Sequence, residues 1–108
     1  MSFRDQVVLI TGAGRGIGRS IACAFAREGA SLALVARSQT EIDQVARELS
    51  SSGVHCLARP ADVSYRSAAE SAVQAVLARF GRLDVLINAA GVYGPIGPLV
   101  ENNLDDWV

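Results

Sequence analysis

The spacing of apolar residues changes several times along the chain. Four short runs are apolar at nearly every position: residues 6–11 (QVVLIT), 31–36 (SLALVA), 54–58 (VHCLA) and 83–88 (LDVLIN). Runs of this length with β-branched residues are typical of strands buried on both faces of a parallel sheet. We therefore predict four strands, and Pro60 is expected to limit the third.

Between the first three strands, apolar residues recur every three or four positions, as on one face of a helix. The first helix is predicted to begin at Gly16 and to end just before Gly29. Ser38 or Thr40 is expected to cap a second helix, and Gly53 to close it. The predicted core face of the second helix comprises Ile42, Val45, Ala46 and Leu49.

A third helix is predicted before the last strand. Ser64 or Ser67 is expected to open it, and Gly81 to end it. A loop rich in glycine and proline follows the fourth strand, and residues 104–108 are typical of the first turn of another helix. The predicted core face of the third helix comprises Ala69, Val73, Val76, Leu77 and Phe80.

The regular alternation of strands and helices predicts a fold of the α/β class. We expect one domain over residues 1–108, part of a three-layer, Rossmann-type, doubly wound parallel sheet with strand order 3-2-1-4. In such sheets ligands bind at the carboxyl ends of the strands where the order reverses, here the first and fourth. Residues 11–18 and 88–91 follow those two strands and are therefore the first places to look for a site.

Composition narrows the classes of partner. The formal charge is −1 without long runs of like charge, which argues against a nucleic-acid surface. No apolar run approaches the roughly 20 residues of a membrane helix, and the first residues lack the apolar core of a signal peptide. We therefore expect a cytoplasmic protein without nucleic-acid or membrane partners. Cys23 and Cys56 are expected to be buried thiols, with a redox pair as the alternative, and His55 to be structural.

The most informative stretch is TGAGRGIG, residues 11–18, between the first strand and the first helix. Such a loop offers unpaired backbone N–H groups and the positive end of a helix dipole, which together favour a phosphate. Gly12 is expected to make the turn, and Gly16 and Gly18 to permit close approach and close packing. The alternative is a flexible turn that binds nothing.

The glycine spacing is G-x-x-x-G-x-G, which differs from the dinucleotide pattern G-x-G-x-x-G. All ten basic residues are arginine, so the lysine of a P-loop is also absent. The spacing present resembles the cofactor motif of the short-chain dehydrogenase/reductase family. Two further matches follow in the family's order, at Asp62-Val63 after the third strand and at Asn88-Ala89-Ala90-Gly91 after the fourth.

The resemblance covers the whole chain and implies a nicotinamide cofactor that exchanges a hydride with a carbonyl or alcohol substrate. It also implies a homo-oligomer. No metal site and no catalytic residue are predicted within the chain. The predicted cofactor-binding residues are Gly12, Gly14, Arg15, Gly16, Ile17, Gly18, Arg37, Ser38, Asp62, Val63, Asn88, Ala89 and Gly91.

The end of the second strand bears on the choice of cofactor. An acid there would hold a ribose 2′-hydroxyl, but Ala36 and Arg37 stand in its place, and the closest carboxylates in sequence are Glu28 and Glu41. A guanidinium at this position can instead bind a 2′-phosphate through two hydrogen bonds, and Arg15 can reach it from the glycine loop. We therefore predict NADP(H) over NAD(H), against the alternative that both arginines are ordinary surface residues.

Asp62 and Asn88 each admit two roles. Asp62 is predicted to accept a hydrogen bond from the adenine amino group, and it could instead cap the turn before the third helix. Asn88 resembles the family asparagine that ties neighbouring strands together near the nicotinamide-side ribose, and either a purely structural role or a contact with the cofactor is open for it. Ala89 stands where the family often has a second asparagine.

Neither Tyr65 nor Tyr93 has a lysine four residues later, as the family's acid–base tyrosine requires. The family's catalytic serine, tyrosine and lysine lie beyond the fourth strand, and we expect this chain to hold the cofactor half and not the acid–base groups. Tyr93 is a candidate for the substrate side of its loop. A continuation of the gene into a Y-x-x-x-K segment would favour an oxidoreductase over a nucleotide-binding module without turnover.

A methyltransferase is a third class, but it would want an acid at the end of the second strand, where Ala36 stands. The fourth strand is apolar throughout, and an open apolar edge is a template for pairing with another chain. We therefore predict that residues 1–108 in isolation are marginally stable, or associate through residues 83–88.

Overall fold

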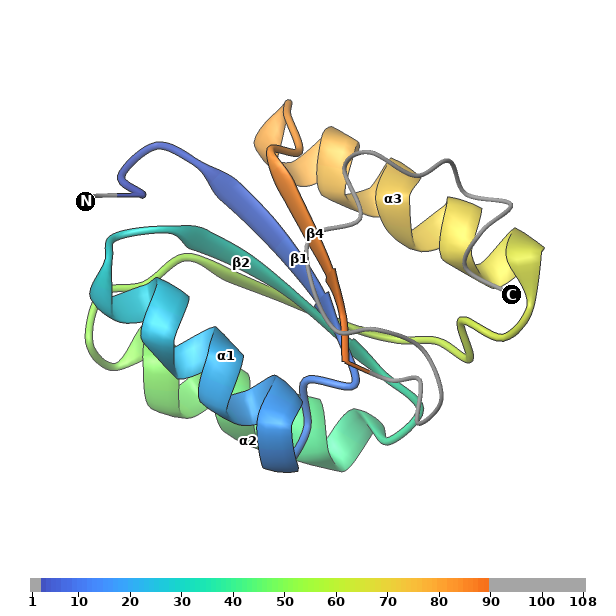
Figure 1. The fold of residues 1–108 in the computed structure, drawn as a ribbon, viewed down its shortest axis with the longest axis horizontal. Helices are drawn as coiled ribbons and strands as arrows, with labels where there is room; N and C mark the ends of the chain where they lie inside the picture. The colour runs from blue at the N-terminus through green and yellow to red at the C-terminus, as the bar shows by residue number, and fades with distance from the viewer. Residues whose placement is uncertain (1–2, 90–108) are drawn as a thin grey trace.

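The computed structural model describes residues 3–89, which form a four-stranded parallel sheet with helices on both faces (Figure 1). Strands and helices alternate along the chain, as predicted. The elements are β1 (Val7–Thr11), α1 (Gly16–Arg27), β2 (Ser31–Ala36), α2 (Gln39–Ser50), β3 (Cys56–Pro60), α3 (Arg66–Phe80) and β4 (Val85–Asn88).

The strand order is β3-β2-β1-β4, which confirms the predicted topology. All three pairings are parallel, and Leu9 of β1 lies level with Ala33 of β2 and Leu86 of β4. The order reverses between β1 and β4, because β2 and β3 continue to one side of β1 and β4 lies on the other. The carboxyl ends of β1 and β4 therefore flank the position where this fold class binds ligands.

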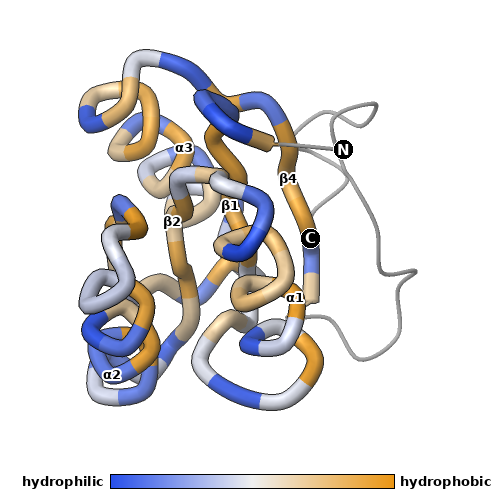
Figure 2. Tube along the Cα trace, turned by 90° about the vertical axis from the view of Figure 1, so that its left-hand side faces the viewer, coloured by the Kyte–Doolittle hydropathy of each residue, from blue (hydrophilic) through white to orange (hydrophobic). Residues whose placement is uncertain are grey.

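Successive side chains of each strand point to opposite faces, so the sheet builds two cores. One core packs α1 and α2 against residues such as Val8 and Ile10. The other packs α3 against Val7 and Leu9. Figure 2 shows why the strands read as continuous apolar runs: both faces are covered, so the tube is hydrophobic along most of each strand, whereas α2 shows both hydrophilic and hydrophobic positions.

Two strands begin two residues later than the sequence predicted, and β1 begins one residue later, at Val7. β3 spans Cys56–Pro60 in place of residues 54–58, because the N–H of Val54 bonds to the carbonyl of Leu49 and so completes the end of α2. β3 lies at the edge of the sheet, where the missing N–H of proline is tolerated, so Pro60 is itself its last residue. β4 likewise begins at Val85, two residues after the predicted start.

The third helix differs from its prediction at its start and along its buried face. Its N-cap is Tyr65 and neither predicted serine, because Ser64 is held in a turn by Asp62. Ala72 is fully buried, while Leu77, predicted in the core, is 40% exposed. Small residues bring this helix close to the sheet, so the buried face is narrower than the apolar pattern suggested. The predicted helix ends at Gly29 and Gly81 are confirmed. The second helix ends earlier than predicted, because α2 stops at Ser50 with Ser51 as its C-cap and Gly53 lies in the turn that follows.

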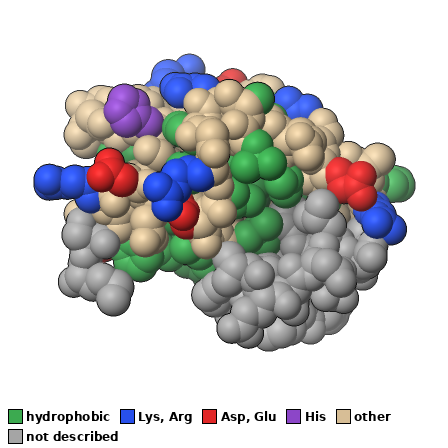
Figure 3. Space-filling model, turned by 90° about the horizontal axis from the view of Figure 1, so that it is seen from above, with side chains coloured by type: hydrophobic (Ala, Val, Ile, Leu, Met, Phe, Trp, Pro, Cys, Tyr) green, Lys and Arg blue, Asp and Glu red, His purple; other side chains and the backbone are tan. Residues whose placement is uncertain are grey.

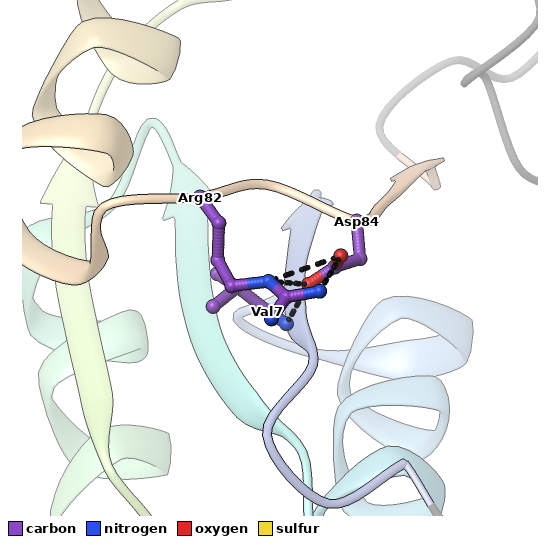
Figure 4. Close-up of polar contacts among 3 residues, drawn as sticks. All are labelled: Val7, Arg82 and Asp84. Carbon is purple, nitrogen blue, oxygen red and sulfur yellow. Dashed lines mark hydrogen bonds and ion pairs between the residues drawn. The ribbon is translucent and has the colours of Figure 1, made fainter.

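The amino ends of β1 and β4 are tied by a carboxylate (Figure 4). Asp84 accepts a hydrogen bond from the backbone N–H of Val7 at 2.8 Å, and Arg82 donates from both Nε and Nη2 to the same carboxylate. The Arg82 hydrogen bonds are the largest cause that lowers the pKa of Asp84, and the Val7 N–H acts in the same direction against the opposing effect of burial. The backbone N–H of Asp84 also bonds to the carbonyl of Val7 at 2.9 Å, so both its backbone and its side chain tie it to the start of β1.

Among residues 3–89, no helix has the length and apolar character needed to cross a bilayer. Within the described sheet β4 is an edge strand, and its predicted association with another chain stays a prediction. The predicted helical turn at residues 104–108 lies outside the described residues, as do Gly91 and Tyr93.

Candidate functional site

A cleft of about 660 Å³ opens at the carboxyl ends of the strands. Its walls come from the loops after β1, β2, β3 and β4, and its size suits a nucleotide-sized ligand. Most predicted contact residues line it, although Ile17 and Gly18 do not and Gly91 is outside the described residues. The predicted residues in its wall are Gly12, Gly14, Arg15, Gly16, Arg37, Ser38, Asp62, Val63, Asn88 and Ala89.

The glycine loop turns sharply out of β1 and into α1. Gly12 has a φ of 67°, in the left-handed region that side chains disfavour, so it makes the turn as predicted. A Cβ built on Gly18 would lie 1.9 Å from the carbonyl oxygen of Gly12, which leaves room for hydrogen alone. Gly18 therefore serves the close packing of α1 on the loop, and its place is behind the cleft.

The start of α1 faces the cleft without a cap of its own. Its N-cap residue, Arg15, makes no side-chain capping hydrogen bond, and the first turn holds no acidic residue. The first N–H groups of a helix have no partner within the helix, and the dipole adds positive charge there. A Cβ at Gly16 would meet no atom within 4 Å, so the space in front of this turn is open. The loop therefore fits an anionic group such as a phosphate.

The first turn of α2 brings a carboxylate into the cleft wall, which the sequence had not indicated. Ser38 caps α2 by accepting a hydrogen bond from the N–H of Glu41 at 3.3 Å. The Glu41 carboxylate lies 4.0 Å from Nε of Arg15. The expectation that no carboxylate stands near the predicted phosphate site is therefore wrong. The spacing S-x-x-E of a capping box was the available signal for this residue at a helix start.

Gly14 explains how Glu41 comes so close. A Cβ on Gly14 would lie 2.8 Å from Cβ of Glu41 and 3.1 Å from its Oε1. The missing side chain at position 14 thus makes room for Glu41 as well as shaping the loop.

Arg37 and Asp62 stand on the other side of the cleft wall, after β2 and β3. Ser64 donates both its hydroxyl and its backbone N–H to Oδ1 of Asp62, at 2.6 and 3.1 Å. These hydrogen bonds are the main causes that lower the pKa of Asp62, and the positive charge of Arg37 contributes in the same direction. Asp62 therefore shapes the turn before α3, the structural alternative of its two predicted roles, while it also lines the cleft.

Asn88 joins the two strands that flank the reversal. The hydroxyl of Thr11, which is fully buried, donates to Oδ1 of Asn88 at 2.9 Å. The N–H of Ala89 then bonds to the carbonyl of Thr11 at 3.2 Å. The predicted role of Asn88 in tying strands together is confirmed, with Thr11 as its partner.

The whole glycine loop and the strands that support it match a known family. A family model described as short chain dehydrogenase matches residues 6–108. The chain belongs to this family. The chain is 39% identical over 107 residues to meso-2,3-butanediol dehydrogenase of Serratia marcescens, covering 99% of this chain and 41% of that protein. It is also 39% identical to D-threitol dehydrogenase of Mycolicibacterium smegmatis, over 94% of this chain and 39% of that protein.

Solved structures of the family resemble this chain in fold. L-Sorbose reductase of Gluconobacter frateurii, complexed with NADPH and L-sorbose, has a TM-score of 0.81 and 38% identity over 84% of this chain. The 3-ketoacyl-(acyl-carrier-protein) reductase of Brucella melitensis, complexed with NADH, has a TM-score of 0.73 and 39% identity over 79% of this chain. The chain covers 35% and 34% of those two proteins, so it spans about a third of their length.

The other titratable side chains that were considered as site residues lie away from the cleft. Tyr65 is 66% exposed at the N-cap of α3 and is absent from the cleft wall. His55 is exposed just before β3, at the opposite end of the sheet. Cys23 and Cys56 are free thiols, but they are half-buried where full burial was expected, and burial raises the pKa of Cys56. No cluster of three metal-ligating side chains exists among residues 3–89.

Charges of both signs are mixed in the cleft and elsewhere. Two arginines and two carboxylates line the cleft, namely Arg15, Arg37, Glu41 and Asp62. On the face seen in Figure 3, basic side chains likewise stand near acidic ones and do not gather into one patch. The site is therefore balanced in charge, and its attraction for an anion depends on which charged groups the ligand reaches.

Proposed function

We propose that this chain supplies the cofactor-binding part of an NADP(H)-dependent oxidoreductase. In this reaction a hydride passes between nicotinamide C4 and a carbonyl or alcohol carbon of a small-molecule substrate. The observation that carries the proposal is the uncapped start of α1, which faces a nucleotide-sized cleft beside the strand-order reversal. Membership of the family supplies the reaction class. A cytoplasmic location and a homo-oligomeric assembly belong to the same proposal.

Different residues of the cleft would hold different parts of the cofactor. The turn from Gly12 to Gly16 would hold the pyrophosphate, because it presents helix N–H groups and the space in front of Gly16 is open. Asp62 and Val63 would border the adenine. Asn88 and Ala89, at the other end of the cleft wall, would border the nicotinamide-side ribose.

The preference for the phosphorylated cofactor rests on Arg15 and Arg37, which line the same cleft. Ala36 stands at the end of β2, where an acid would otherwise accept a hydrogen bond from the ribose hydroxyl. Among the relatives, L-sorbose reductase is complexed with NADPH and an alcohol dehydrogenase of Thermococcus sibiricus with 5-hydroxy-NADP. The Brucella melitensis reductase is complexed with NADH, so the arginines and not the family decide the preference proposed for this chain.

The described residues orient the cofactor and leave proton transfer to other groups. Tyr65 lies outside the cleft wall, and the 108 residues contain no lysine to lower the pKa of a tyrosine. The second candidate is a dinucleotide-binding or interaction module without turnover, because the same cleft would serve it equally. Oxidation of NADPH by the full-length protein in the presence of small aldehydes and ketones would separate the two, since a module binds the cofactor and consumes none.

Replacing Arg37 by aspartate tests the cofactor preference. We expect the unchanged full-length protein to bind NADP⁺ more tightly than NAD⁺, and Arg37→Asp to lose at least about tenfold in NADP⁺ affinity, because a bidentate charged contact becomes a repulsion. Dissociation constants for both cofactors, measured by titration calorimetry, give the result. Arg47→Asp is the matched control, since Arg47 is exposed on α2 and outside the cleft wall. Equal affinity of the unchanged protein for the two cofactors would contradict the proposal.

A further inference from the structure

Two ion pairs join α1 and its N-cap to α2. Arg15 pairs with Glu41, and Arg19, one turn further along α1, pairs with Glu48, two turns further along α2. The two pairs use the same residue types, but Arg15 is 85% exposed and lies 4.0 Å from its partner, whereas Arg19 and Glu48 are half-exposed and directly hydrogen-bonded. They differ in position, because Arg15 and Glu41 line the cleft and Arg19 and Glu48 do not.

The position of Glu41 is set by the backbone on both sides of it. Its own N–H bonds to the hydroxyl of Ser38, which places it in the first turn of α2. Its side chain lies against Gly14. A Cβ at position 14 would come within 2.8 Å of Cβ of Glu41, so a side chain there would collide with Glu41. The Ser38 bond thus fixes the backbone of Glu41, the bare Gly14 leaves room for its side chain, and its carboxylate lies 4.0 Å from Arg15.

We propose that Glu41 is a specificity-determining residue that competes with the cofactor's 2′-phosphate for Arg15. The inference rests on the proposed function, because it concerns how the same cleft chooses between two cofactors. To bind the 2′-phosphate, Arg15 must exchange one anionic partner for another, and the phosphate must approach the displaced carboxylate. A 2′-hydroxyl meets neither obstacle. Glu41 therefore lowers the affinity for NADP(H) and leaves the affinity for NAD(H) almost unchanged.

Removing the charge of Glu41 tests this competition. In the full-length protein we expect Glu41→Gln to bind NADP⁺ about fivefold more tightly, because an exposed charge pair of this kind changes affinity by a small factor. NAD⁺ affinity should stay within about twofold. Titration calorimetry with both cofactors gives the ratio of the two dissociation constants. This ratio does not depend on the fraction of folded protein, because both ligands bind the same folded molecules.

Glu48→Gln is the matched control, since it removes the same charge from the same helix outside the cleft, and it should leave the ratio unchanged. The gain in NADP⁺ affinity from Glu41→Gln should also be smaller in an Arg15→Gln background, because no guanidinium remains there to pair with Glu41. Glu41→Ala should shift the ratio in the same direction, which guards against an effect peculiar to glutamine.

Three results would overturn the inference while leaving the proposed function intact. Weaker NADP⁺ binding by Glu41→Gln would mean that the carboxylate orients Arg15 for the phosphate. Weaker NAD⁺ binding would mean that it accepts a hydrogen bond from the ribose hydroxyl. An equal gain in NADP⁺ affinity from Glu48→Gln would mean that the effect comes from the net charge of the protein and not from the position of Glu41. Failure of the unchanged protein to bind either cofactor would instead overturn the proposed function, and this inference with it.

Discussion

Helices α1 and α2 both begin at the cleft, and they begin in opposite ways. The start of α2 is complete in itself, with the Ser38 hydroxyl accepting the N–H of Glu41 and an acidic residue in the first turn. The start of α1 has Arg15 at its N-cap, no capping side chain and no acid in its first turn. A capped start contributes to stability, typically about 0.5–2 kcal/mol. The uncapped start of α1 forgoes that stabilisation and keeps its N–H groups available for an anion.

The largest expected effect on this comparison comes from a substitution that displaces α1 from the glycine loop. We expect Gly18→Ala to lower the free energy of unfolding by about 3 kcal/mol or more, because its Cβ would meet the carbonyl of Gly12 at 1.9 Å. Urea denaturation followed by circular dichroism measures the change. Gly16→Ala is the matched control: it meets no neighbouring atom but carries a φ of 60°, so it should cost only about 1–2 kcal/mol. Equal losses in the two variants would contradict this account.

A smaller change makes the start of α2 resemble that of α1. Ser38→Ala removes the capping hydroxyl and should lower the free energy of unfolding by about 1 kcal/mol. Ser52→Ala, at an exposed position after the same helix, should change it by less than about 0.5 kcal/mol. The same urea titrations serve for both variants. If Ser38→Ala were as stable as the Ser52 variant, the contrast between the two helix starts would carry no energetic meaning.

The smallest expected effect concerns the turn before a third helix, α3, whose N-cap Tyr65 makes no side-chain capping hydrogen bond. The hydrogen bonds from Ser64 hold the pKa of Asp62 below its usual value. The stabilisation from Asp62 is therefore fully present above the pKa of an unfolded aspartate, near 3.9, and is lost as the pH falls through the folded pKa. Asp62→Asn keeps the acceptor without the charge, so its unfolding free energy should fall less between pH 5 and pH 2. Identical acid profiles for the two proteins would contradict this assignment.

The sequence was informative wherever one residue type or one local period decides the structure. The order of elements followed from apolar periodicity, and the turn at Gly12 and the helix end at Gly81 followed from glycine. The cleft-lining arginines followed from their places after β1 and β2, because the carboxyl ends of parallel strands share one edge of a sheet.

The predictions that failed depend on packing between distant segments. Glu41 enters the cleft because Gly14 admits it, and those positions are 27 residues apart, so no local pattern reveals the contact. Ala72 is buried and Leu77 is exposed because the orientation of α3 on the sheet, which depends on packing with distant strands, decides which apolar positions are covered. The start of β3 was misplaced because Val54 is used by the preceding helix end.

The two strands at the reversal are held together at both ends. Asp84 joins the amino ends through the N–H of Val7, and the Thr11 hydroxyl joins the carboxyl ends through Asn88. These two contacts, one at each end, fix the register of β1 against β4. The residues that follow the two strands, Gly12 and Ala89, therefore emerge together in the wall of the cleft.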